Sequence, residues 1–134
     1  PNEQEVRFAL GDQDSVIRPL GSALYDQAGC KILMLKVGAR GMLTFRDSLA
    51  NADRRSFFTV DALARDNIAD PVGSGDALLA YATLAQVATK NEAISSIIGT
   101  IAAGLECEFE GNIPVTPDLV SKRLRELETA SEFS

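Results

Sequence analysis

The sequence contains no histidine, and this absence excludes several kinds of chemistry. Within these 134 residues there can be no catalytic triad that relies on histidine and none of the common zinc sites. The two cysteines, Cys30 and Cys107, lack metal-ligand spacing, and so few cysteines are typical of a reducing compartment. No apolar stretch approaches the roughly 20 residues that span a bilayer, and no signal peptide is visible. We therefore expect a cytoplasmic protein with no membrane partner.

Positive charge is also scarce. Thirteen Lys and Arg stand against nineteen Asp and Glu, the net charge is −6, and no dense basic run exists, so we expect no nucleic-acid partner. The 46% hydrophobic and 24% charged fractions are typical of one globular domain that buries a core. The chain begins at Pro1, and its only methionines are Met34 and Met42, so we expect a piece of a longer protein.

The most informative stretch runs from Asp70 to Asp76. Gly73 and Gly75 bracket Ser74, Asp76 follows at once, and the apolar run 77–82 comes next. This pattern predicts a tight turn into a buried helix, whose first amides and dipole can hold an anion beside a carboxylate. A phosphate held next to a base is the arrangement that phosphoryl transfer needs. The alternative, that the stretch only caps a core helix, stays open on the residues alone.

The rest of the chain alternates helix and strand patterns, which predicts an α/β fold. Helices are expected at 2–10, 14–28 and 76–88, the last one buried on all sides, then from Asn91 and from Pro117. The apolar run 31–37 predicts a strand buried on both faces, and 41–46 with 56–60 predicts a hairpin. The glycine loop 38–41 follows the first strand, where α/β folds place ligands.

Three segments together resemble the ribokinase-like (PfkB-type) carbohydrate kinases. They are 1–5, which matches Asn-x-x-Glu, the strand and glycine loop 36–41, and 70–76, which matches Asp-Pro-x-Gly-Ser-Gly-Asp. All three occur in the family's order and cover essentially the whole chain. The resemblance implies a three-layer, Rossmann-like domain whose mixed sheet has a parallel core and an antiparallel hairpin. It also implies that residues 1–134 are a single domain, the C-terminal nucleotide-binding part, without the N-terminal substrate and lid part.

The resemblance also implies roles for individual residues. Asp76 would be the catalytic base, with the backbone amides of Gly73, Ser74 and Gly75 stabilising the transferring phosphoryl group. The implied nucleotide contacts are Lys36, Gly38, Arg40, Gly41, Gly73, Gly75 and Thr100, and the implied metal residues are Asn2, Glu5 and Asp70. The sequence departs from the family at Lys36, where many members have Thr, at Thr100, where many have Asn, and at Tyr81, where many have Gly. We expect the bulky Tyr81 either to displace a neighbouring segment or to find a hydroxyl partner.

The implied function is ATP-dependent phosphorylation of a sugar or sugar-phosphate hydroxyl, with ATP and magnesium as cofactors. Many relatives also use a monovalent cation such as potassium at the position of Asp70, and the full-length protein can be a homo-oligomer. Because the acceptor site lies mainly in the absent part, we expect the isolated chain to be inactive. Two alternatives stay open: a non-catalytic nucleotide-binding or regulatory module, and an unrelated α/β domain whose glycine turn is only structural.

Overall fold

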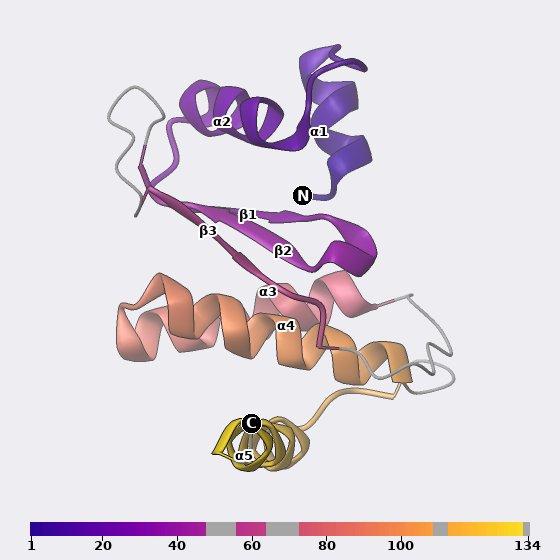
Figure 1. Cartoon of the computed structure of the whole chain (residues 1–134), viewed down its shortest axis with the longest axis vertical. Coiled ribbons are helices and arrows are strands. Elements are labelled where there is room, and N and C mark those ends of the chain that lie inside the picture. Colours follow the sequence, from indigo (N-terminus) through magenta and orange to yellow (C-terminus); the bar gives the residue numbers. More distant parts are fainter. Residues whose placement is uncertain (48–55, 64–72, 109–112, 133–134) are drawn as a thin grey trace. The chain divides into compact units, whose positions relative to one another are not determined.

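The computed structural model describes residues 1–47, 56–63, 73–108 and 113–132 of the chain. The described residues divide into two compact units, Pro1–Ala62 and Leu63–Ser134, and each is considered by itself (Figure 1). That both belong to a single domain stays a prediction.

Three strands form an antiparallel sheet in the first unit. They are β1 (Leu33–Lys36), β2 (Met42–Phe45) and β3 (Phe57–Val60), in the order β1-β2-β3. The hairpin predicted for 41–46 and 56–60 is therefore confirmed, with Met42 opposite Val60. The glycine loop forms a short 3-10 turn, η1 (Gly38–Arg40), and joins two antiparallel strands. Within the described residues, parallel pairing is limited to the isolated bridge between Asn2 and Lys36.

Helices α1 (Glu3–Leu10) and α2 (Ile17–Ala28) precede the sheet. The prediction for α1 is confirmed, including its end at Gly11, whose φ of 64° suits a glycine. Helix α2 begins three residues later than the expected Asp14. The reason is local: the Asp12 carboxylate accepts hydrogen bonds from the amides of Asp14 and Ser15, which holds this segment in a turn. Hydrogen bonding from Ser15 also lowers the pKa of Asp12.

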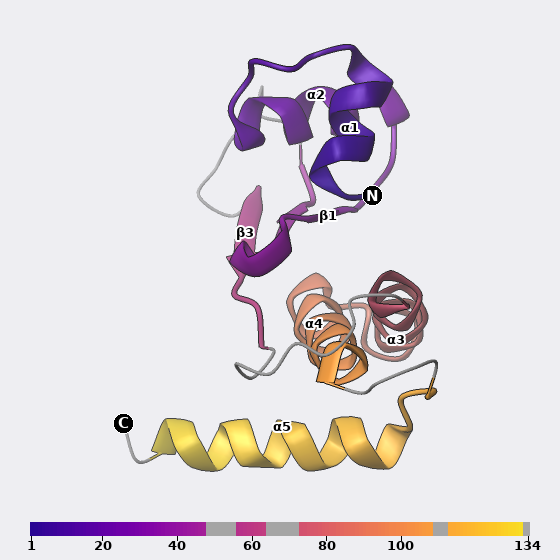
Figure 2. The same cartoon turned by 90° about the vertical axis from the view of Figure 1, so that its right-hand side faces the viewer.

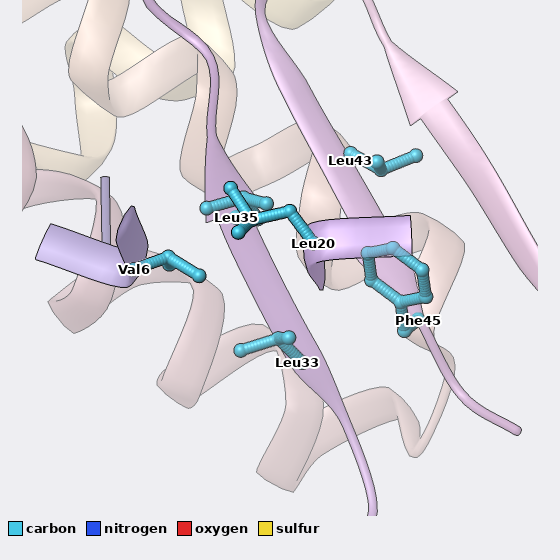
Figure 3. Packing of buried hydrophobic residues seen from close by; sticks show 6 residues of the cluster. All are labelled: Val6, Leu20, Leu33, Leu35, Leu43 and Phe45. Carbon is cyan, nitrogen blue, oxygen red and sulfur yellow. The ribbon is translucent and has the colours of Figure 1, made fainter. Parts of the chain in front are cut away.

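The core of the first unit lies between the two helices and the sheet (Figure 3). Its buried residues are Val6 of α1, Leu20 of α2, Leu33 and Leu35 of β1, and Leu43 and Phe45 of β2. In β1 the buried leucines alternate with half-buried Met34 and Lys36. The expectation of a strand buried on both faces is therefore wrong for this chain: β1 shows the alternation of a strand with one covered face.

The second unit consists of helices α3 (Ser74–Thr89), α4 (Glu92–Glu108) and α5 (Pro117–Glu132). Helices α3 and α4 form a tight hairpin and lie side by side, as the view along them shows (Figure 2). The Asn91 side chain caps α4, as expected, by accepting hydrogen bonds from the amides of Ala93 and Ile94. The helices approach closely at Gly99, where a Cβ would lie only 2.9 Å from the Cβ of Ala82.

Helix α5 begins with Pro117 as its first helical residue, as expected. It packs through Val120 against Ile101 and Leu105 of α4. The buried Arg123 makes a two-pronged ion pair with Glu108, with its nitrogens 3.0 and 2.7 Å from the carboxylate oxygens. None of the described helices is long and apolar enough to cross a membrane.

Helix α3 is not buried on all sides, contrary to the expectation from its composition. Ala82 is its only buried residue. Leu79, Leu84 and Val87 are 66%, 66% and 74% exposed. Apolar composition around a whole helix signals burial on every face. Within the second unit α4 covers one face of α3 and leaves the opposite face exposed.

Candidate functional site

Three of the predicted site residues meet at the start of α1. The Asn2 side chain accepts a hydrogen bond of 2.8 Å from the Glu5 amide, and the Glu5 carboxylate accepts one of 2.7 Å from the Asn2 amide. This reciprocal pair is a capping box. Lys36 pairs with Asn2 through the isolated bridge, and its amide donates to the carbonyl of Pro1. The backbone of β1 at Lys36 therefore lies beside the start of α1, although the two segments are more than thirty residues apart in the sequence.

A carboxylate that was not predicted holds Arg40. Nη2 of Arg40 lies 2.8 Å from Oε2 of Glu3, and the other Glu3 oxygen accepts from Arg7. Arg40 is 63% exposed, so its guanidinium can still reach a ligand. The role of Glu3 was missed because its partner is distant in sequence, and no local pattern signals such a pair.

The two loop glycines differ in what surrounds them. Gly38 has a φ of 61° and open space around the position of a Cβ. Gly41 has a φ of 87°, and a Cβ there would overlap the Val60 carbonyl oxygen and lie 2.6 Å from the Ala62 nitrogen. Gly41 is thus required by the close approach of the chain after β3. Its predicted nucleotide contact is a separate matter that the fold does not test.

The predicted anion turn lies at the start of α3. Gly73 precedes the helix with a φ of 87° and ψ of −20°, a left-handed conformation that disfavours side chains. Gly75 is within the helix and has no positive φ. The conformational need for glycine therefore falls on Gly73. Helices α1 and α4 begin with asparagine side chains that accept from the first amides, whereas Gly73 offers no side chain.

Asp76 occupies the first turn of α3 and is exposed. Its amide donates 2.9 Å to the carbonyl of Gly73, which fixes the backbone beside the turn. The Thr100 side chain is buried in α4, and its hydroxyl donates to the Ser96 carbonyl. Because the hydroxyl proton is engaged in this bond, the Thr100 oxygen could only accept a hydrogen bond from a nucleotide. Asp70, the remaining predicted metal residue, lies outside the described residues.

Tyr81 has found a hydroxyl partner. The phenol donates 2.7 Å to the Val115 carbonyl oxygen, just before α5, and burial raises its pKa. The sequence indicated that this side chain needed a partner. Only the fold identified which one it is.

Within the residues that the structure describes, no group of three or more Cys, Asp or Glu side chains is placed to hold a metal ion. Asn2 and Glu5 supply oxygen atoms, the kind of ligand that magnesium prefers, and magnesium usually keeps several waters. These two residues therefore fit a role in orienting the waters of a magnesium ion better than a role as a complete cage.

No protein-family model matches the sequence, and no curated protein matches it. Solved structures do match. Arabidopsis thaliana ribokinase complexed with ribose and ATP aligns with a TM-score of 0.77 and 22% identity over 93% of this chain and 39% of that one. Escherichia coli phosphofructokinase-2 in complex with potassium gives a TM-score of 0.76 and 17% identity over 96% and 40%. Thermotoga maritima ribokinase gives 0.76 and 21% over 93% and 41%.

The chain therefore has a ribokinase-like α/β fold, and the resemblance inferred from its sequence is confirmed at the level of fold. It spans only about 40% of the length of these sugar and sugar-phosphate kinases.

Proposed function

We propose that the chain is part of a kinase that transfers the γ-phosphoryl group of ATP to a hydroxyl of a sugar or sugar phosphate. The observation that carries the proposal is the start of α3, where Gly73 in a left-handed conformation sets Asp76 into the first helical turn. The ribokinase-like fold supports this assignment, because the solved relatives include a ribokinase with ribose and ATP. The acceptor-binding residues belong to the part of the fold that the chain does not span.

Asp76 would act as the general base. It is exposed, so an acceptor hydroxyl can reach its carboxylate. The carboxylate takes the hydroxyl proton as that oxygen attacks the γ-phosphorus, and the bond from phosphorus to the bridging oxygen of ADP breaks. A positioned general base contributes roughly 10²–10⁴-fold to the rate.

The backbone at the start of α3 would stabilise the transferring phosphoryl group. The amides of Gly73, Ser74 and Gly75 precede or begin the helix, where the positive end of the helix dipole lies. Fixed donors of this kind act on charge that develops in the transition state, without reorganising during the reaction. They are the second part of the proposed machinery.

The first unit would hold the nucleotide phosphates and their metal. Lys36 and Arg40 supply positive charge, Gly38 and Gly41 supply backbone, and Glu5 with Asn2 would orient the waters of magnesium. When bound, magnesium neutralises charge on the β- and γ-phosphates. Thr100 as a nucleotide contact and a monovalent cation beside Asp70 belong to the same proposal.

Calorimetric titration of the chain with ATP, with and without magnesium, tests the proposal. We expect binding that strengthens with magnesium and weakens in Arg40→Gln. Arg125→Gln is the matched control, because it removes the same charge from an exposed position of α5. A chain that is folded by circular dichroism but takes up no ATP would instead have a purely structural glycine turn.

One observation favours a second candidate, a non-catalytic nucleotide-binding module. The Asn2 and Glu5 side chains already satisfy each other's amides, so a purely structural account of both is complete without a metal. A binding module would take up ATP with equal affinity in the presence and absence of magnesium. A magnesium dependence that Glu5→Gln abolishes would support the kinase.

A further inference from the structure

Three charged side chains of the first unit form a continuous cluster of ion pairs. Oε1 of Glu3 accepts two hydrogen bonds from Arg7, of 3.1 Å from Nε and 2.8 Å from Nη2, and Oε2 of Glu3 lies 2.8 Å from Nη2 of Arg40. Nη1 of Arg7 also donates to the carbonyl of Ser15, at 3.0 Å. All of these residues lie within Pro1–Ala62, so the cluster is internal to one unit. Each oxygen of the Glu3 carboxylate therefore pairs with a different guanidinium.

The two guanidinium groups differ in how firmly they are held. The Arg7 side chain is 18% exposed, and it contacts both Glu3, one turn away on α1, and the backbone before α2. The Arg40 side chain is 63% exposed, and among the described residues Glu3 is its one hydrogen-bond partner. A long exposed side chain loses little free energy when it leaves a single ion pair. Glu3 and Arg7 are therefore the fixed part of the cluster, and Arg40 is the part that can exchange partners.

We propose that Glu3 is an internal competitor for the nucleotide phosphate at Arg40, and that Arg7 determines how strongly Glu3 competes. The inference rests on the proposed function, which makes Arg40 a phosphate contact. A carboxylate and a phosphate present the same kind of oxygen acceptor to a guanidinium. Glu3 thus accepts, in the free chain, a hydrogen bond that a phosphate at Arg40 would take over. A phosphate that used only the other nitrogens of Arg40 would still meet the negative charge of Glu3 beside it.

Arg7 acts on this competition through Glu3. Its other acceptors are the backbone carbonyls of Asp12 and Ser15, which lie between α1 and α2 and not in the glycine loop. The positive charge of Arg7 partly neutralises the Glu3 carboxylate, and this weakens the attraction between Glu3 and Arg40. Arg7 is therefore a positioning residue, which holds Glu3 in place and moderates its charge without contacting the nucleotide.

Calorimetric titration of the 134-residue chain with ATP at low ionic strength tests the competition in a double-mutant cycle. We expect Glu3→Gln to raise the affinity by at most about five-fold, and to have no effect when Arg40→Gln is also present. An effect of the same size in both backgrounds would overturn the proposal, because Glu3 would then repel the nucleotide from a distance. Weaker binding in Glu3→Gln would overturn it as well.

Arg7→Gln tests the second half of the proposal. It should weaken ATP binding by roughly two- to five-fold in the original chain, and by less than about two-fold when Glu3→Gln is also present. Arg7→Lys, which keeps the charge, should bind ATP like the original chain. Lys31→Gln is the matched control, since it removes the same charge from an exposed position of the same unit. Equal weakening by Arg7→Gln in both backgrounds would mean that Arg7 only supports the fold, and would overturn its role in the competition.

Inorganic tripolyphosphate separates this inference from the proposed function, because it presents phosphate oxygens without adenine or ribose. A chain that binds tripolyphosphate with the same dependence on Glu3 and Arg40, but binds ATP no better, would lose the kinase assignment and keep the competition. A chain whose affinity for ATP is unchanged in Glu3→Gln would keep the assignment and lose the competition. Circular dichroism of every variant confirms that it is folded before its affinity is compared.

Discussion

Arg40, in the turn between β1 and β2, donates a 2.8 Å hydrogen bond to Glu3 at the start of α1, although 37 positions separate them. The predicted phosphate contact is therefore held by a carboxylate. A phosphate that binds Arg40 must share the guanidinium with Glu3 or displace it. The pair thus links the helix that carries Asn2 and Glu5 to the glycine loop.

Glu3→Gln should strengthen ATP binding, because it removes the charge that competes for Arg40. Exposed ion pairs are worth about 0.2–1 kcal/mol, so the gain should be at most about five-fold. Arg40→Gln should weaken binding, and calorimetry measures both. Glu128→Gln on α5 controls for net charge. Weaker binding in Glu3→Gln would mean that Glu3 positions Arg40 for the phosphate.

If Asp76 is the base of the proposed kinase, Asp76→Asn in the complete polypeptide should lower kcat by roughly 10²–10⁴-fold. The ATP dissociation constant should hardly change, because the proposed function assigns phosphate binding to backbone amides rather than to this side chain. Asp118→Asn is the matched control, since Asp118 also occupies the first turn of a helix. A kcat within a few-fold of the original enzyme would remove Asp76 from the mechanism.

Gly73→Val should destabilise the start of α3 by about 1–2 kcal/mol, because valine resists a φ of 87°. It should also weaken ATP binding. Gly11→Val has a comparable penalty at a φ of 64°, with open space around the side chain. Denaturation and calorimetry on both variants separate the effects: equal ATP affinities would make Gly73 a purely structural residue. Gly75→Val then tests close approach of the backbone without the conformational penalty.

Gly41→Ala should cost more stability than Gly38→Ala, by at least about 1 kcal/mol. Both glycines have positive φ, but only at Gly41 would a Cβ meet backbone, at the Val60 carbonyl and the Ala62 nitrogen. Urea denaturation of the two variants measures the difference. Equal losses would show that the chain after β3 shifts to accommodate the methyl group.

The 134-residue chain should fold but should not phosphorylate sugars at a useful rate. Holding an acceptor in line and excluding water can supply several kcal/mol of barrier reduction, and the proposed function assigns both tasks to residues outside this chain. A coupled assay of ADP release over a panel of sugars and sugar phosphates measures this. Robust sugar-dependent turnover would place the acceptor site within these residues.

The sequence predicted those features that depend on neighbouring residues. Asn2, Gly11 and Asn91 mark helix boundaries because caps involve amides three or four positions away. Helix α2 nevertheless begins later than its sequence pattern predicts, because the Asp12 carboxylate holds the residues before it in a turn. The ribokinase-like fold followed from three ordered motifs, and the solved structures confirmed it.

Only the tertiary structure decided the contacts between distant segments. It paired Arg40 with Glu3 and Tyr81 with Val115, and it assigned the left-handed conformation to Gly73 rather than Gly75. Within the second unit it left one face of α3 uncovered, although the composition of this helix indicated burial on all sides. The physical reason is the same in each case. The type of a residue determines which kind of partner its side chain requires, but the packing of distant segments determines which residue becomes that partner.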